Sequence, residues 1–391
     1  VKKCRLTDEE VKEFKKKCQK DWRSRNIEKT KNYFLINQKK TQMTDIANRY
    51  KNNPILSPKD LNASDENMII ECLLNPGAFE FNGRIGLLLR VAERTVQKDG
   101  LLSVPIYNNE GKVEILNFKL DDPKLNASDS RVIKYDGIDY LTTISHLRLV
   151  WSNDSVNFIE DPEYSSLFGE GEYESYGIED CRVTKIEDTY HLTYTMVSAN
   201  GVGVGLRTTK DWKTFEKKGM IFSPHNKDCA IFEEKFNDKF YALHRPSSPE
   251  LGGNYIWLAE SPDGIHWGNH KCIAKTREGK FDSKRLGAGA APIKTDKGWL
   301  EIYHGATKEN RYCLGALLLD LKDPSIVLAR SEEPIMVPME PYERTGFFGE
   351  VIFTNGHIVN GDEIKMYYGA ADEFVGLATF SISEIIKTLH V

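Results

Sequence analysis

The feature that most constrains this chain is a unit of three short β-patterned runs that occurs five times along it. The copy at residues 177–212 is complete, with runs at 181–185, 190–197 and 202–207. The other copies begin near Gly77, Ala230, Ala291 and Val351, so the repeat is about 50 to 60 residues long except where an insertion lengthens the first copy. The recurrence predicts a repeat architecture of small antiparallel sheets.

Tight turns separate the first two runs of these copies. Asn82-Gly83, Asn237-Asp238 and Asn360-Gly361 each lie between two β-patterned runs, which is the pattern of a β-hairpin. One small sheet cannot bury both of its faces, whereas copies arranged around an axis bury each other's faces and leave short edges. We therefore predict an all-β fold, a five-bladed β-propeller. A β-sandwich with accidental similarity is the alternative, which the constant order of turn types disfavours.

Positive charge is concentrated at the start of the chain. Residues 1–60 hold 17 Lys and Arg against 8 Asp and Glu, although the whole chain has a net charge of −5. A nucleic-acid-binding arm would have this composition, but Thr7 and Glu10 form a capping-box pattern, and Val11, Phe14 and Trp22 recur near the helical period. We predict a basic helical extension at residues 1–51, packed on the propeller or on another copy in a homo-oligomer, followed by a catalytic propeller domain at residues 52–391. Because the extension lacks aromatic stacking platforms, we expect no nucleic-acid partner.

Other classes of protein are disfavoured by what the sequence lacks. No run of 18 apolar residues is present, so no membrane span is expected. The seven cysteines lack CxxC spacing and the histidines lack HxH spacing. We therefore expect neither a disulfide framework nor a metal site nor a cofactor.

Polar residues recur just before the first run of each copy and at the end of the second run. The first group contains Asn75, Glu179, Asp180, Asn226, Lys227, Asp228, Asp282, Lys284, Arg285 and Glu350, and the second contains Arg90, Arg94, His244, Arg245, Tyr303, His304 and Asp372. In a propeller, these positions converge from separate blades on one funnel. Carboxylates, amides, aromatic rings and cations together suit a polyhydroxylated ligand with an anionic partner. For each residue taken alone, a surface ion pair or a hydrogen bond between blades is the alternative.

Several longer motifs resemble those of a known enzyme family. GIEDCRVTKIEDTYHLTYT resembles the GxEDPRxT motif of glycoside hydrolase family 130, the mannoside phosphorylases, and NKDCAIFEEK, YALHRPSS, SKRLGAGAAPIKTDKGWLEIYHGA and YYGAAD resemble its later motifs. The resemblance covers residues 52–383. It implies a five-bladed propeller that cleaves β-mannosides with inversion, using inorganic phosphate as co-substrate and releasing α-mannose 1-phosphate. The late motifs are most similar to members that act on β-1,2-linked mannose, so the expected partners are a β-manno-oligosaccharide and phosphate.

The resemblance also implies roles for individual residues. Asp139 matches the family's proton donor. The phosphate ligands implied by the motifs are Arg182, Lys227, His244 and, less directly, Arg245. The implied mannose-binding residues are Asn75, Arg90, Asp180, Asp228 and Asp372. Tyr303 and His304 are implied to contact the sugar, although a core aromatic describes Tyr303 equally well.

The chain departs from the family pattern at four places. Gly203 stands where some members carry a second arginine, with Arg207 four residues later, and Cys181 replaces a proline. Glu350 replaces an asparagine and Glu233 a proline. A carboxylate facing the anomeric carbon would repel phosphate and could activate water, so hydrolysis with Glu350 or Glu233 as base is the alternative to phosphorolysis. A non-catalytic mannan-binding propeller is a further alternative, but it would need neither an acid nor a basic cluster.

Overall fold

The computed structural model describes residues 45–128, 131–247 and 251–390. The chain divides into two units, Val1–Thr44 and Asp45–Val391. The predicted basic helix falls on the first unit, outside the described residues, and stays a prediction. In the described ranges, no helix has the length and apolar character needed to span a bilayer.

Five antiparallel sheets follow one another within the described residues. In chain order, the first sheet contains β2 (Met68–Phe81), β3 (Arg84–Thr95), β9 (Thr143–Ser152) and β10 (Ile159–Glu160), and the second contains β11 (Ile178–Ile186), β12 (Thr189–Ser198), β13 (Gly201–Thr209) and β14 (Glu216–Phe222). The third sheet contains β15 (Asn226–Ile231), β16 (Phe240–Pro246), β17 (Ile256–Ser261) and β18 (Gly268–Ala274). The fourth sheet contains β19 (Arg285–Gly287), β20 (Ile293–Lys294), β21 (Trp299–Ala306), β22 (Tyr312–Leu319) and β23 (Val327–Arg330). The fifth contains β24 (Ile352–Asn360), β25 (Glu363–Ala370), β26 (Phe374–Ser381) and β1 (Asn48–Arg49). The predicted mostly-β, antiparallel class is confirmed.

The fourth strand of the fifth sheet comes from the start of the described chain. β1 pairs with β26, placing Asn48 opposite Thr379 and Arg49 opposite Ala378. In the other sheets, the fourth strand follows the predicted three-strand unit directly in sequence. Residues 45–51, which the sequence assigned to the extension, therefore add a strand to the last sheet and join the two ends of the repeat array.

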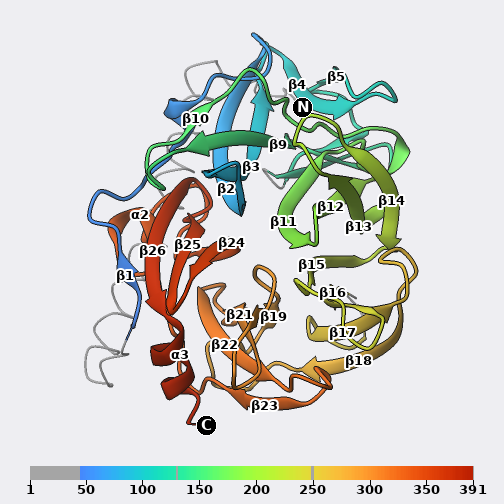
Figure 1. Ribbon diagram of the computed structural model, residues 1–391. Coiled ribbons are helices and arrows are strands. Elements are labelled where there is room, and N and C mark those ends of the chain that lie inside the picture. Colours follow the sequence, from blue (N-terminus) through green and yellow to red (C-terminus); the bar gives the residue numbers. More distant parts are fainter. Residues whose placement is uncertain (1–44, 129–130, 248–250, 391) are drawn as a thin grey trace. The chain divides into compact units, whose positions relative to one another are not determined.

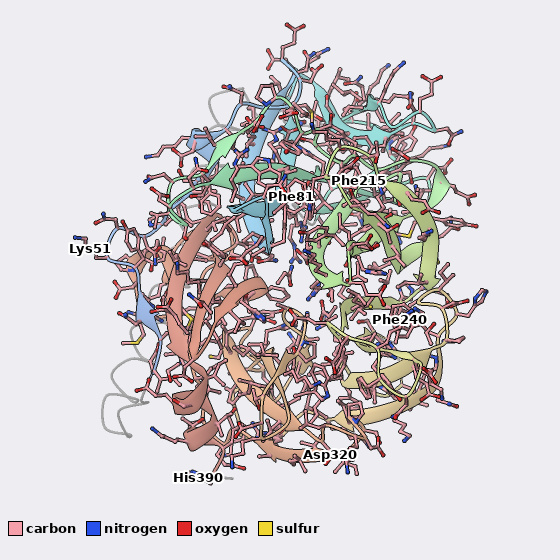
Figure 2. All side chains as sticks on the ribbon, in the orientation of Figure 1. Lys51, Phe81, Phe215, Phe240, Asp320 and His390 are labelled. Carbon is pink, nitrogen blue, oxygen red and sulfur yellow. The ribbon has the colours of Figure 1, made fainter. Side chains whose placement is uncertain are left out.

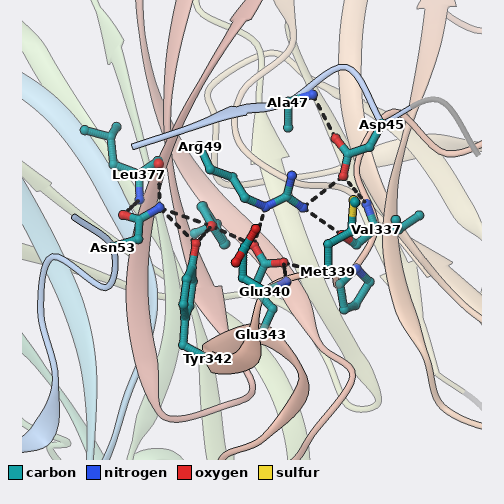
Figure 3. A network of polar contacts seen from close by, with 12 residues as sticks. Asp45, Ala47, Arg49, Asn53, Val337, Met339, Glu340, Tyr342, Glu343 and Leu377 are labelled. Carbon is teal, nitrogen blue, oxygen red and sulfur yellow. Dashed lines mark hydrogen bonds and ion pairs between the residues drawn. The ribbon is translucent and has the colours of Figure 1, made fainter. Parts of the chain in front are cut away.

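A buried polar network fastens this segment in place (Figure 3). Arg49 donates from Nε to Glu343 Oε1 at 2.7 Å and from Nη2 to Asp45 Oδ2 at 2.9 Å. Tyr368 on β25 donates its hydroxyl to the same Glu343 Oε1 at 2.8 Å. Glu343 lies on the short helix α2 (Pro341–Arg344) and is fully buried. Because a buried carboxylate is stable only when it is paired, this contact ties β1, β25 and α2 together.

Apolar side chains fill the spaces between neighbouring sheets. One cluster joins the first and second sheets, and others join the second to the third, the third to the fourth, the fourth to the fifth, and the fifth back to the first. Phe81, for example, packs between the first two sheets, against Trp151 and Tyr190 (Figure 2). The five sheets therefore form a closed ring, and β2, β11, β15, β19 and β24 line its centre (Figure 1).

The insertion in the first repeat folds into two small sheets of its own. One is the hairpin of β4 (Leu101–Tyr107) and β5 (Val113–Lys119), and the other contains β6 (Leu125–Asn126), β7 (Val132–Tyr135) and β8 (Ile138–Leu141). Tyr140 on β8 packs against Tyr176 with ring centroids 5.8 Å apart. The insertion thus lies close to the start of β11, which begins the second sheet. The remaining short helices are η1 (Pro58–Asp60), η2 (Glu172–Glu174) and α3 (Ile382–Thr388).

Candidate active site

Three polar residues occupy equivalent positions in the innermost strands of the first three sheets. Asn75 in β2, Asp180 in β11 and Asp228 in β15 have positive φ angles of 38°, 49° and 53°. Each lies in a bulge, where the pairing with the second strand of its sheet is shifted. Bulges re-aim side chains and are common beside active sites, and Asn and Asp tolerate the left-handed backbone better than most residues. The repeat therefore presents one polar side chain from each of three sheets.

The sequence predicted these residues just before the first strands, and the structure corrects that placement. β2 begins at Met68, seven residues before Asn75, and β11 and β15 begin two residues before Asp180 and Asp228. The bulge is the physical reason, because it lets a residue with little β preference interrupt a strand without ending the strand's pairing.

Carboxylates of the second sheet surround Arg90 of the first. Arg90 donates from Nη1 to Asp180 Oδ1 at 3.2 Å and from Nη2 to Glu179 Oε1 at 2.7 Å. Asn75 Nδ2 donates to the same Asp180 Oδ1 at 2.9 Å. The structure thus brings together three of the residues expected to bind the sugar.

Asp180 and Asp372 differ in protonation. Burial opposes ionisation of Asp180, but Arg90, Lys227 and Arg182 keep its pKa below the ordinary value. Burial raises the pKa of Asp372 to about 7, with Arg90 opposing the rise and Asp180 and Glu179 adding to it. At neutral pH, Asp372 is therefore near the midpoint of its titration, which is typical of a functional carboxyl group.

Asp228 is the anion at the middle of a second cluster. Its Oδ1 lies 3.3 Å from Arg182 Nη2, and its Oδ2 lies 3.0 Å from Arg245 Nε and 3.3 Å from His304 Nε2. Burial disfavours the ionised form, but Arg245, His304 and Arg182 hold the pKa of Asp228 well below its ordinary value. Burial also lowers the pKa of His304 to about 4, although Asp228 opposes this, so His304 is neutral at neutral pH.

The guanidinium group of Arg182 is committed to the protein. It donates from Nε to Gly289 O, from Nη1 to Asp180 O, and from Nη2 to Ala288 O, each at 2.9 Å, in addition to its bond to Asp228 Oδ1. These bonds use four of the five N–H groups of an arginine. Arg182 is 1 % exposed. In this arrangement, Arg182 orients Asp228 and the Ala288-Gly289 segment, and it has little capacity left for a phosphate.

His244 faces a different set of neighbours from Arg245. Its Nδ1 lies 3.0 Å from Asn226 Nδ2, its Nε2 lies 3.1 Å from His270 Nδ1, and its ring stacks on Phe222 at 4.4 Å. Burial and His270 lower its pKa to about 3. Both ring nitrogens are thus engaged, and none of these contacts involves Arg182 or Asp228.

Tyr303 belongs to the core. Its ring is fully buried between the third and fourth sheets, and its hydroxyl donates to Asp282 Oδ2 at 2.8 Å. The same hydroxyl accepts from Arg330 Nε at 3.1 Å. The core-aromatic interpretation therefore describes Tyr303, and a sugar contact is incompatible with this burial.

Asp139, the expected acid, lies on β8 of the insertion. Its side chain is 61 % exposed, and Lys134 Nζ is 3.4 Å from its Oδ1. It is on the same short strand as Tyr140, whose ring contacts Tyr176 near the start of β11. The described structure thus places Asp139 on a hairpin beside the second sheet, outside the hydrogen bonds of the Asp180 and Asp228 clusters.

The two carboxylates considered as bases lie apart from each other. Glu350 Oε2 accepts from Arg311 Nε and its Oε1 from Arg344 Nε, each at 3.2 Å, so both oxygens contact guanidinium groups. Glu233 is exposed in the connection between β15 and β16, at the opposite end of β15 from Asp228.

Arg207 does not take the place of the arginine missing at Gly203. It donates from Nη2 to Glu174 Oε2 at 3.0 Å and from Nε to the Tyr194 hydroxyl at 3.2 Å. Glu174 is fully buried and also pairs with Lys217 at 2.9 Å. Arg207 therefore belongs to a structural network that holds η2 against the second sheet.

Three residues to which the sequence gave no individual role belong to the same region. Arg285 begins β19, Tyr312 begins β22, and Glu301 lies buried on β21 behind Arg182. For Arg285, the signal was its position before the fourth repeat. For Glu301, a carboxylate within a β-patterned run was the signal. Nothing in the local sequence pattern indicated that Tyr312 belongs to this region.

The centre of this ring of antiparallel sheets combines carboxylates with buried guanidinium groups, which suits a polyhydroxylated ligand and an anion. A family model described as beta-1,4-mannooligosaccharide phosphorylase matches residues 131–391. A beta-1,2-mannobiose phosphorylase of Listeria innocua is 46 % identical over 349 residues, which are 88 % of this chain and 98 % of that protein. This chain belongs to glycoside hydrolase family 130, as the motifs predicted.

Further relatives agree with this assignment. A solved structure of the Listeria innocua beta-1,2-mannobiose phosphorylase in complex with beta-1,2-mannobiose matches with a TM-score of 0.83 and 44 % identity, covering 88 % of this chain and 99 % of that one. A 1,2-beta-oligomannan phosphorylase of Thermoanaerobacter is 40 % identical over 247 residues, covering 62 % of this chain and 80 % of that protein.

Proposed function

We propose that this chain catalyses the phosphorolysis of β-1,2-linked mannosides, with a disaccharide as the simplest substrate. The observation that carries the proposal is the 46 % identity to a beta-1,2-mannobiose phosphorylase over 98 % of that protein's length. In the reaction, a phosphate oxygen attacks the anomeric carbon, the bond from that carbon to the glycosidic oxygen breaks, and the leaving oxygen takes a proton. Attack from the opposite face inverts the configuration and gives α-mannose 1-phosphate.

We infer that the five sheets are the blades of a five-bladed propeller whose centre holds the substrates. The Asn75, Arg90 and Asp180 cluster supplies acceptors and donors for sugar hydroxyls, and Asp372 adds a carboxyl group beside it. Lys227 and Arg245 stand opposite each other in the pairing of β15 with β16 and supply positive charge for phosphate. Asp139 is the proposed proton donor, carried by the insertion.

Hydrolysis gains no support from the geometry. Glu350 lies two residues before β24, the innermost strand of the fifth sheet, but Arg311 and Arg344 donate to its oxygens. A general base needs a free oxygen within hydrogen-bond reach of the attacking water. The cationic residues around Asp228 instead favour an anionic nucleophile.

The test is to incubate the protein with β-1,2-mannobiose, with and without inorganic phosphate, and to quantify mannose and mannose 1-phosphate. We expect mannose 1-phosphate and mannose in equal amounts, and only when phosphate is present. Free mannose alone, at a rate indifferent to phosphate, would identify a hydrolase. A Lys227→Ala variant should raise the phosphate concentration needed for half-maximal rate while leaving any slow phosphate-independent hydrolysis unchanged.

A further inference from the structure

Two backbone hydrogen bonds fix the turn that carries Asp372. Phe348 N donates to Ala371 O at 3.0 Å, and Ala371 N donates to Val351 O at 2.9 Å. Both Ala371 and Asp372 have φ angles of 50°, in the left-handed region. That region is costly for a residue with a Cβ and persists where surrounding contacts hold it. The loop at residues 345–351 therefore holds the backbone from which the Asp372 side chain starts.

The loop at residues 345–351 follows directly on the short helix α2 and is bonded to it. Val351 N donates to the backbone oxygen of Glu343, on α2, at 3.1 Å. A Cβ built on Gly346 would come within 2.6 Å of Ala371 O, so the loop packs directly on the turn. Two hydrogen bonds in series, both through Val351, thus connect α2 to this turn.

The side chain of Glu343 fixes α2 within the protein. It is fully buried, and its Oε2 accepts from the backbone nitrogens of Met339 at 2.7 Å and Glu340 at 3.0 Å. Its Oε1 accepts from Arg49 Nε and from the Tyr368 hydroxyl (Figure 3). Arg49 supplies the opposite charge, since the other described donors to this carboxylate are neutral. Because a buried carboxylate that loses its cation is strongly destabilised, the position of α2 depends on Arg49.

We propose that Arg49 is a positioning residue for Asp372, and thereby for the mannosyl group that this carboxyl group binds. The inference rests on the proposed function, in which Asp372 contacts the sugar. Arg49 holds Glu343, which holds the backbone of Val351. Val351 in turn holds Ala371, the residue before Asp372. The sequence assigned Arg49 to an extension outside the catalytic domain, whereas this connection makes it a support of the sugar site.

The titration of Asp372 reports whether the carboxyl group keeps its place. The charged and titratable groups that face it come from four strands: Arg90 of β3, Cys72 of β2, Glu179 and Asp180 of β11, and Tyr312 of β22. Burial raises the pKa of Asp372 to about 7. A turn that loses its support lets water reach the carboxyl group, so the pKa of Asp372 should fall toward its ordinary value of 3.8.

The test uses Arg49→Met, with Arg84→Met as the control. Arg84 begins β3 and pairs through Nη1 with Asp161 Oδ2 at 2.8 Å, so its loss removes an ion pair outside the connection to Asp372. We expect Arg49→Met to raise KM for β-1,2-mannobiose by about 3-fold to 10-fold and to change KM for phosphate by less than about twofold. A bend near pH 7 in the pH profile of kcat/KM should move to lower pH by about half a unit or more. Arg84→Met should resemble the wild type in all three respects.

Two milder variants keep the test independent of whether Arg49→Met folds well. Arg49→Lys restores the charge beside Glu343 without the forked donors and should recover part of the loss. Tyr368→Phe removes one donor to Glu343 and keeps the ring in the core, so it should act in the same direction as Arg49→Met but to a smaller extent.

The same substitution in an Asp372→Asn background separates positioning from a general loss of stability. If Arg49 acts through Asp372, Arg49→Met raises the disaccharide KM less in this background than in the wild type. An equal rise in both backgrounds would overturn the proposal. So would an equal rise in KM for phosphate and disaccharide, or a loss of stability that leaves KM and the pH profile unchanged.

The Kd of the disaccharide, measured by calorimetry, distinguishes failure of the positioning role from failure of the proposed reaction. A wild type that binds β-1,2-mannobiose but makes no mannose 1-phosphate would refute phosphorolysis, and Arg49→Met should then still raise the Kd. An unchanged Kd in Arg49→Met, or a wild type that does not bind the disaccharide, would overturn the positioning role.

Discussion

Replacing Glu301 by Gln should remove a large loss of folding stability that the wild type suffers as the pH rises. Glu301 is fully buried on β21, its Oε1 accepts from Gly289 N at 2.7 Å, and its Oε2 has no hydrogen-bond partner among the described residues. Burial raises its pKa from 4.5 to about 8, with the Gly289 N–H and Arg182 opposing the rise. Glu301→Gln keeps the acceptor for Gly289 and carries no ionisable group.

The sign and size of the effect follow from proton linkage. The folded protein holds the Glu301 proton up to about pH 8, whereas the unfolded chain releases it above pH 4.5. Stability is therefore lost as the pH rises through this window, by about 1.4 kcal/mol for each pH unit. The full cost above pH 8 is on the order of 5 kcal/mol.

Urea unfolding of both proteins at several pH values between 5 and 9 measures this cost. We expect similar stability of the wild type and Glu301→Gln at pH 5 and a gap of several kcal/mol in favour of the variant at pH 9. Glu278→Gln, which alters an exposed carboxylate paired with Lys308, is the control and should follow the wild type at every pH. A difference between wild type and Glu301→Gln that is constant across this range would refute the buried neutral carboxyl group.

Three further changes test other parts of the site. Asp372→Asn should abolish a bend near pH 7 in the pH profile of kcat/KM for β-1,2-mannobiose, because the pKa of Asp372 is about 7; a bend that persists assigns it to another group. Asp139→Asn should lower kcat by about 100-fold or more while disaccharide binding, measured by calorimetry, stays the same; unchanged turnover would remove the acid assignment. Arg207→Met should destabilise the protein to urea by about 3–5 kcal/mol, because it breaks a buried pair with Glu174, but should leave KM for phosphate unchanged. A raised phosphate KM in that variant would place Arg207 in the site after all.

The hairpin turns and the order of the repeats could be predicted because they depend on neighbouring residues. Asn82-Gly83 lies between β2 and β3, and Asn360 ends β24 just before β25, as the turn pattern indicated. The fourth strand of the last sheet could not be predicted from neighbouring residues, because β1 pairs with a strand more than 300 residues away. A pairing partner so distant leaves no mark on the local pattern of Asn48 and Arg49.

The identity of the polar residues at the centre was likewise within reach of the sequence, but their chemical states were not. Asn75, Asp180 and Asp228 could be recognised from their recurrence in the repeat and from the family motifs. Their bulged backbone and their partners depend on contacts between sheets, such as the bond from Asn75 to Asp180 across 105 residues of chain. The same holds for Arg182, which the motif assigned to phosphate and which the structure bonds to Gly289 O, 107 residues away.

The sequence by itself determined the repeat, the mostly-β class and the family, because each can be recognised from patterns that span a few neighbouring residues. The tertiary structure decided which charges are satisfied within the protein and which remain available for a ligand. Arg182 and Arg285 are both cations on innermost strands, and the local sequence does not show which of them is satisfied within the protein. Burial, backbone carbonyls and opposing charges from other sheets separate the two, because the cost of a buried charge depends on the groups folded around it.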